Sequence, residues 1–308
     1  MRVAVIGAGG IGAPLGASLA LAGQEDVTFL ARGSHLAAMR ANGLKIEGDR
    51  GESLIRPAQA TDDPAAIGPV DLVLFCVKLW DVESAGEQIR PLMGHDTAVI
   101  PLQNGVDASE RLIPILGAGR VMGGTAVITG SIVAPGVVRQ SGQHHRIVFG
   151  ELDGRITPRG EAIRDVCQAA GITAELSGDI QRIRWAKFIA LVAASGVCAV
   201  TRLSIGPLRD DPDIAPLFEE AMREVVAVGE ACGVRFMPDV LDPWRALLRG
   251  VPPDWTPSMA VDIRAGRRLE LPWLGGKLVE LAAAHGVPVP VNRVISATLK
   301  PYANGALS

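Results

Sequence analysis

A glycine-rich hexapeptide near the N-terminus has the spacing of a dinucleotide-binding loop. It reads Gly7-Ala8-Gly9-Gly10-Ile11-Gly12 and directly follows the apolar segment 3–6. Glycines at this spacing permit a tight turn and let the backbone approach a pyrophosphate, which the free N–H groups of the next helix can bind. The motif alone is weak, but its place after a strand and before a helix is the required one. A turn that only packs helix on strand is the alternative.

The residues after the second expected strand indicate which dinucleotide would bind. NAD sites usually place Asp or Glu there, to accept a hydrogen bond from the ribose 2′-hydroxyl. This chain has Leu30-Ala31-Arg32 instead, and its nearby acids, Glu25 and Asp26, precede the strand. A guanidinium can bind a 2′-phosphate through paired hydrogen bonds. Arg32 therefore predicts NADP(H), with a solvated loop arginine as the alternative.

Two further polar residues follow expected strands. Lys78 comes after residues 71–77, and Asn104 comes after residues 97–102. Ligands of parallel sheets bind outside the carboxyl ends of the strands, so both residues are candidate cofactor-binding groups. The alternatives are a solvated lysine and, for Asn104-Gly105, a simple turn.

The first half of the chain alternates strand-like and helix-like segments. Apolar runs predict strands, glycine and Asn-Gly signals end the helices, and Pro135-Gly136 predicts a turn in a strand-rich region. The expected strands are 3–6, 27–30, 71–77, 97–102 and 172–176, with further strands between 120 and 148; the expected helices are 10–22, 35–41 and 157–170. This alternation predicts a Rossmann-type, doubly wound parallel sheet in an α/β domain at residues 1–178.

From residue 179 onward the patterns are helical. The expected helices are 179–200, 213–232, 238–249, 275–285 and 292–302, and Gly233, Gly250 and Gly286 supply stops. The second domain, residues 179–308, is therefore expected to be all-helical.

Composition excludes several classes of protein. The 308 residues are 48% hydrophobic and 20% charged, which argues against disorder. Thirty basic and 33 acidic residues give a net charge of −3, so neither nucleic acid nor an anionic membrane is an expected partner. The uncharged run 3–24 invites a signal or membrane segment, but its glycines and Pro14 disfavour one.

Cysteine and histidine usage points to a reducing compartment and to no metal. The 4 cysteines show no CxxC spacing, which fits reduced thiols in the cytoplasm. The pair His144-His145 lacks spaced partners for a metal, so we expect a polar strand edge or loop there.

Short motifs over nearly the whole chain occur in the order and at the spacing of one enzyme family. They are residues 7–12, Val77-Lys78, Gln103-Asn104-Gly105, Trp185-Ala186-Lys187-Phe188, Ser258-Met259 with Asp262-Ile263, and Glu270. The set resembles the ketopantoate reductase (2-dehydropantoate 2-reductase) family. The resemblance implies a Rossmann domain, a helical domain and an active site in the cleft between them. It also implies NADPH-dependent reduction of a small 2-oxo acid, ketopantoate, to pantoate on the route to pantothenate and coenzyme A, and a possible homodimer.

The resemblance assigns roles to individual residues. Lys187 matches the catalytic lysine, and Glu270 matches the glutamate of the active-site motif. Lys78 and Asn104 match residues at the cofactor and substrate, and Ser258 matches a substrate-contacting serine. An ammonium group can stabilise the negative charge that grows on a carbonyl oxygen and donate its proton, and a nearby carboxylate would keep that ammonium charged.

Each of these residues also has a purely structural interpretation. Lys187 could extend to solvent from an apolar helix. Glu270 could form a surface ion pair with Arg267 or Arg268. Ser258 could serve only in the first turn of a helix.

The helix that carries the lysine departs from the family pattern. Lys187, Leu191 and Ser195 share one helical stripe, and the better-known reductases have asparagine at the last two positions. We therefore expect Leu191 and Ser195 to form an altered substrate-binding wall. One alternative function is a paralogous NADPH-dependent reductase of a more apolar 2-oxo acid. Another is a non-catalytic NADP-binding sensor.

Overall fold

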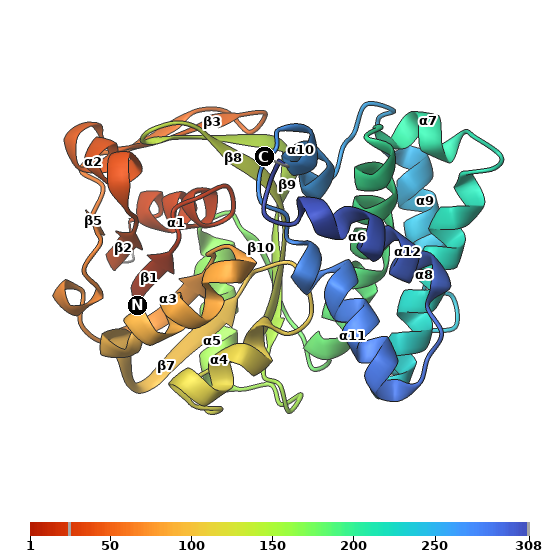
Figure 1. The fold of residues 1–308 in the computed structure, drawn as a ribbon. Coiled ribbons are helices and arrows are strands. Elements are labelled where there is room, and N and C mark those ends of the chain that lie inside the picture. The colour runs from red at the N-terminus through yellow and green to blue at the C-terminus, as the bar shows by residue number, and fades with distance from the viewer. Residues whose placement is uncertain (24–25, 307–308) are drawn as a thin grey trace. The chain divides into compact units, whose positions relative to one another are not determined.

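The protein forms two compact units in a computed structural model that describes residues 1–23 and 26–306 (Figure 1). The units are Met1–Ile180 and Gln181–Ser308. Glu25, one of the two acids before the second strand, lies outside the described residues.

A parallel sheet in the order β5-β2-β1-β6-β7 forms the centre of the first unit. Its strands are β1 (Arg2–Ile6), β2 (Asp26–Leu30), β5 (Ala60–Thr61), β6 (Val70–Phe75) and β7 (Met93–Pro101). The apolar run in β1 is buried from Val3 to Ile6 because helices cover both faces of the sheet. The predicted Rossmann-type sheet is confirmed, and residues 3–21 form its middle strand and first helix.

The two faces of this sheet bury alternate residues against different helices. Ala4, Ile6 and Phe75 pack with α3 and α4, whereas Val3 and Leu74 pack on the side of α1. The helices of this unit are α1 (Gly12–Leu21), α2 (Gly33–Asn42), α3 (Val82–Gln88), α4 (Ala108–Leu116) and α5 (Pro158–Ala169), with short 3-10 turns η1 (Pro64–Ala66), η2 (Leu79–Asp81) and η3 (Arg90–Leu92).

A second sheet in the first unit was not predicted. Its strands are β3 (Leu44–Gly48), β4 (Ser53–Ile55), β8 (Gly123–Ala134), β9 (Val137–Gly150) and β10 (Thr173–Leu176). The predicted turn at Pro135-Gly136 joins the antiparallel strands β8 and β9. The prediction that residues 172–176 extend the first sheet is wrong, because β10 pairs in parallel with β9. The reason is that the long β8–β9 hairpin offers β10 an edge outside the first sheet.

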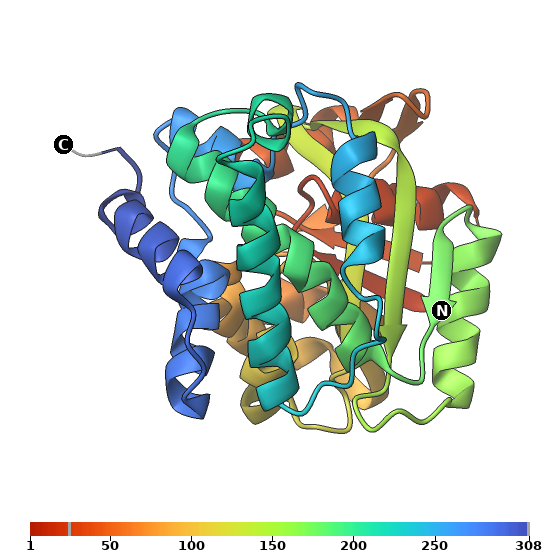
Figure 2. The same ribbon diagram turned by 90° about the vertical axis from the view of Figure 1, so that its right-hand side faces the viewer.

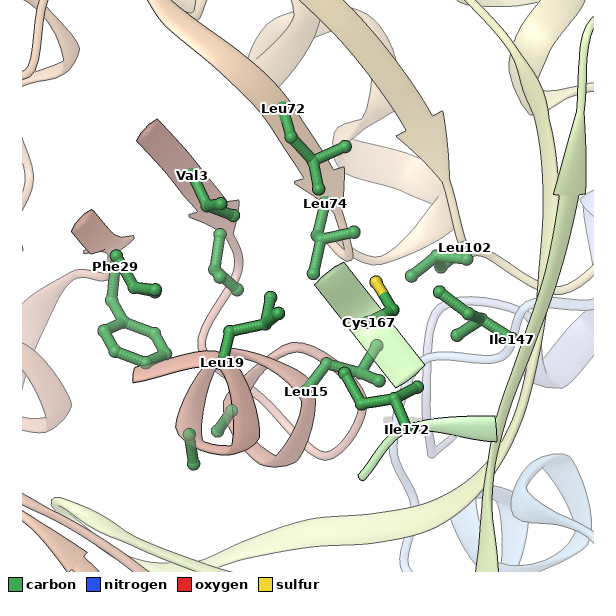
Figure 3. Packing of buried hydrophobic residues seen from close by; sticks show 14 of the residues in the cluster. Val3, Leu15, Leu19, Phe29, Leu72, Leu74, Leu102, Ile147, Cys167 and Ile172 are labelled. Atoms are coloured by element: carbon green, nitrogen blue, oxygen red, sulfur yellow. The ribbon is translucent and has the colours of Figure 1, made fainter. Parts of the chain in front are cut away.

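Helix α1 joins the cores of the two sheets. It contacts β1 and β2 on one side and β3, β4 and β9 on the other. Figure 3 shows Leu15 and Leu19 of α1 among Val3 and Leu74 of the first sheet and Ile147 of β9. The glycine loop is thus anchored by a helix that is held between two layers.

The second unit is helical, as predicted. Its helices are α6 (Ile180–Thr201, whose first residue belongs to the first unit), α7 (Ile205–Arg209), α8 (Ala215–Ala231), α9 (Asp242–Gly250), α10 (Ser258–Arg264), α11 (Gly275–His285) and α12 (Pro290–Leu299), with η4 (Leu271–Trp273) and η5 (Lys300–Tyr302). Figure 2 shows α8 in teal beside α11 and α12 in blue, which it contacts.

Helix α6 is long and apolar enough to cross a membrane by length and composition. Its apolar centre, residues 188–200, is only 13 residues long, which is too short to span a bilayer. Most of the helix is buried inside the structure, and a buried core helix passes the same test. The length of α6 therefore gives no support to a membrane span.

Candidate active site

The glycine loop follows β1 and has the backbone conformation that its sequence requires. Gly7 has a φ of +95°, and a Cβ at this residue would lie 3.0 Å from the carbonyl carbon and oxygen of Cys76. The Gly7 N–H donates to the carbonyl oxygen of Leu30 at 3.1 Å, which ties the loop to the end of β2. Only glycine fits this position without strain.

The next two glycines differ in their surroundings. A Cβ on Gly9 would meet no described atom within 4 Å, whereas a Cβ on Gly10 would lie 1.9 Å from the carbonyl oxygen of Gly130 in β8. The loop therefore rests against β8 on one side and is open on the other. Helix α1 begins just beyond, and its N-cap residue, Ile11, makes no side-chain capping hydrogen bond. Free N–H groups beside open space fit a pyrophosphate.

His35 on α2 holds this loop in place, a role that its sequence context did not reveal. The Gly136 N–H donates to Nδ1 of His35 at 3.0 Å, so the ring proton lies on Nε2, which is 2.9 Å from the Ala8 carbonyl oxygen. Burial lowers the pKa of His35, which favours this neutral form. The imidazole thus links the glycine loop to the β8–β9 turn.

Arg32 lies just beyond β2, at the N-cap position of α2. Its side chain is 85% exposed, and its Nη2 lies 3.2 Å from Oδ2 of Asp81. An exposed pair of this kind is weak. The guanidinium is therefore accessible to a ligand, although it already faces a carboxylate.

Lys78 and Asn104 lie at the same edge of the first sheet as Arg32, because the parallel strands β2, β6 and β7 all end there. Lys78 is exposed, with its Nζ 5.6 Å from the centre of the Trp80 ring. Asn104 is half-buried. The neighbouring Gln103 donates from Nε2 to the carbonyl oxygens of Phe75 at 2.9 Å and Val77 at 3.0 Å. The structure thus brings the candidate cofactor residues to one edge.

In the second unit, Lys187 lies on α6 in an apolar setting. Trp185 and Phe188 are buried on either side of it in sequence, with their rings edge to face at 5.6 Å. Burial lowers the pKa of Lys187 to about 8, and the charge of Glu270 opposes this shift. Lys187 is half-buried, and the lowered pKa means that it loses its proton closer to neutral pH than an ordinary lysine does.

Glu270 is a buried carboxylate, only 7% exposed. Arg267 instead pairs with Asp262, with 2.8 Å between Nε and Oδ1, and Arg268 lies 5.7 Å from the centre of the Trp273 ring. Arg267 is therefore paired with Asp262, and Glu270 is a buried group rather than a surface carboxylate.

The expected substrate residues of the second unit differ in accessibility. Ser258 is exposed and begins α10, one residue after the N-cap Pro257. Leu191 is half-buried, whereas Ser195 is fully buried. The Ser195 hydroxyl has no hydrogen-bond partner among the described residues. A buried unpaired hydroxyl costs about 1–3 kcal/mol.

The described part of the chain contains no group of three or more potential metal-ligating side chains. His145 is only 3% exposed, and its Nε2 lies 3.0 Å from the Ser18 hydroxyl. The expectation of a polar strand edge or loop is wrong for this residue, because β9 turns it inward under α1. Burial, aided by the charge of Arg50, lowers the pKa of His145 to about 4.

Comparison with known proteins identifies the family. The model described as "Ketopantoate reductase PanE/ApbA" matches residues 3–154, and its C-terminal counterpart matches residues 179–303. The chain belongs to the ketopantoate reductase family. As a member, it is an oxidoreductase of the 2-dehydropantoate 2-reductase type, a pyridine-nucleotide-dependent class that acts on small substrates.

Individual relatives cover almost the whole chain. A ketopantoate reductase structure from Ralstonia eutropha JMP134 is 32% identical with a TM-score of 0.90, and covers 98% of both chains. The 2-dehydropantoate 2-reductase of Halobacterium salinarum is 31% identical over 96% of this chain and 97% of its own. A D-mandelate dehydrogenase with NADH, at 18% identity, TM-score 0.89 and 98% coverage of both chains, shares the fold.

Proposed function

We propose that the chain reduces ketopantoate to pantoate with NADPH, on the route to pantothenate and coenzyme A. The observation that carries this proposal is the presence, in one unit, of a half-buried lysine and a buried carboxylate whose charges interact. Lys187 has a pKa lowered to about 8, and Glu270 supplies the charge that limits the shift. A sensor of the dinucleotide would need the glycine loop but not this pair.

In the proposed mechanism, Lys187 acts on the substrate carbonyl. Bound NADPH supplies a hydride to the carbonyl carbon. The Lys187 ammonium donates a hydrogen bond to the carbonyl oxygen and then transfers its proton, leaving a neutral amine. Glu270 keeps the lysine protonated before the reaction, because an opposite charge offsets the cost of burial.

The first unit is proposed to hold the cofactor. The open side of the loop at Gly9 and the start of α1 fit the pyrophosphate. Arg32 is proposed to bind the 2′-phosphate, and Lys78 and Asn104 to bind the cofactor near the strand ends. Asn104 is also proposed to contact the substrate.

The second candidate function is reduction of a more apolar 2-oxo acid. Leu191 favours it, because it presents a half-buried apolar side chain one helical turn from Lys187. Ser258 and Ser195 complete the proposed substrate wall. The cytoplasmic location and the homodimer stay predictions from the sequence.

A steady-state assay tests both candidates. NADPH absorbance is followed with ketopantoate and with a series of 2-oxo acids of increasing apolar size. Lys187→Ala should lower kcat by about 100-fold or more with NADPH binding retained, and the exposed Lys300→Ala serves as the matched control. Binding of NADPH without its oxidation by any of these acids would overturn the proposal in favour of a sensor.

A further inference from the structure

We propose that Asp81 tunes the choice between NADPH and NADH, by opposing the 2′-phosphate and accepting a hydrogen bond from a free 2′-hydroxyl. This inference rests on the proposed role of Arg32 as the 2′-phosphate ligand. It assigns to the site a second cofactor class, the unphosphorylated dinucleotide.

The geometry brings a carboxylate to the group that should bind phosphate. Asp81 is the last residue of η2 after β6, and its Oδ2 lies 3.2 Å from Nη2 of Arg32, beyond β2. The Asp81 side chain is 27% exposed, so it is the more firmly placed partner of the 85% exposed Arg32.

The Asp81 side chain does not cap the helix that follows it. Asp81 occupies the N-cap position of α3, where an aspartate ordinarily accepts a hydrogen bond from the first turn. Its side chain makes no such bond with α3, a helix that the structure describes in full. The carboxylate instead faces Arg32, from 49 residues further along the chain.

Asp81 supplies the carboxylate that is absent from the end of β2. In NAD sites an acid at the end of the second strand accepts from the ribose 2′-hydroxyl. Here the carboxylate is that of Asp81, which follows β6. It lies against Arg32, the residue that stands after β2 where an NAD site would have an acid. A 2′-phosphate bound by Arg32 would meet a like charge at close range, whereas a 2′-hydroxyl would meet an acceptor.

Equilibrium binding tests the proposal without turnover. The Kd values of NADP⁺ and NAD⁺, and of the fragments 2′,5′-ADP and 5′-AMP, are measured by calorimetry for the wild type and for Asp81→Asn. We expect Asp81→Asn to bind NADP⁺ and 2′,5′-ADP about fivefold more tightly, the scale of one exposed charge interaction. Binding of NAD⁺ should be unchanged or weaker.

Control variants separate charge from folding. Asp81→Glu keeps the charge and should retain the wild-type ratio of Kd values. Glu175→Gln removes the carboxylate of another exposed pair, 2.6 Å from Arg146, and should not change the ratio. If Asp81→Asn unfolds, Asp81→Ser makes the same test. A ratio in Asp81→Asn within about twofold of the wild type would overturn the proposal.

The Arg32→Ala variant distinguishes this failure from failure of the proposed function. If Arg32→Ala weakens NADP⁺ much more than NAD⁺ while Asp81→Asn leaves the ratio unchanged, only the role of Asp81 is overturned. If Arg32→Ala weakens both dinucleotides equally, the 2′-phosphate site itself is wrong.

Discussion

Nε2 of His35 donates to the Ala8 carbonyl oxygen across 2.9 Å, while Nδ1 of the same ring accepts from the N–H of Gly136. One neutral side chain therefore fixes the peptide that opens the glycine loop and the turn that ends β8. The backbone groups expected to bind the pyrophosphate depend on this orientation.

Variants at His35 should affect dinucleotide binding through the loop. Gln can replace the Nε2 donor to Ala8, whereas Asn can replace the Nδ1 acceptor for Gly136. His35→Asn should weaken NADP⁺ binding at least about fivefold, because it leaves the Ala8 carbonyl unpaired, and His35→Gln should weaken it less. Calorimetric Kd values and thermal unfolding are compared. Equal weakening in both variants, in step with lost stability, would reduce His35 to a packing role.

Gly9→Ala should impair dinucleotide binding, whereas Gly10→Ala should impair stability. A methyl at Gly9 enters open space, so the fold should be unchanged and dinucleotide binding weakened by about tenfold. A methyl at Gly10 collides with the Gly130 backbone, so stability should fall by about 1–3 kcal/mol. Urea unfolding and NADP⁺ titration measure the two effects. A stable Gly10→Ala protein would contradict the close packing of the loop on β8.

The pH dependence of reduction should follow Lys187. Its pKa of about 8 means that the ammonium is present below that pH and lost above it. The kcat/KM for reduction should therefore fall as pH rises through about 8. Glu270→Gln removes the charge that raises this pKa, so the fall should begin at lower pH. The surface variant Glu280→Gln, on α11, is the control, and a profile unmoved by Glu270→Gln would remove Glu270 from its proposed role.

Buried His145 should make the first unit sensitive to acid. Its folded pKa of about 4 lies below the ordinary histidine value of about 6.5, so the unfolded chain binds the proton first. Stability should be intact above about pH 6.5 and should decline as pH falls toward 4, by up to about 3 kcal/mol. Urea unfolding between pH 7 and 4 should show a steeper loss for the wild type than for His145→Gln. Parallel losses would show that other groups cause the acid sensitivity.

The sequence predicted those parts of the fold whose signals are local. The apolar strands at 3–6 and 71–77 and the helix at 275–285 follow from periodicity and stop signals. It did not predict that β10 pairs with β9 rather than with the first sheet, because strand partners are set by packing over long separations. The inward orientation of His145 could not be predicted either, because it also depends on packing between segments distant in sequence.

In the candidate site, too, local features could be predicted from the sequence and tertiary contacts could not. Spacing along the chain was sufficient for the glycine loop and for the residues that follow each strand. The contacts of Asp81 with Arg32 and of His35 with Ala8 join segments that are distant in sequence, and no sequence motif predicts either contact. The burial of Glu270 likewise depends on tertiary structure.

The two bonds from the Gln103 amide to the end of β6 have a practical consequence for redesign. They hold the main chain immediately before position 104 through the side chain of its neighbour. If Asn104 contacts the substrate as proposed, an engineer seeking a different acceptor ketone would vary residue 104 and keep Gln103, whose amide holds the preceding main chain in place.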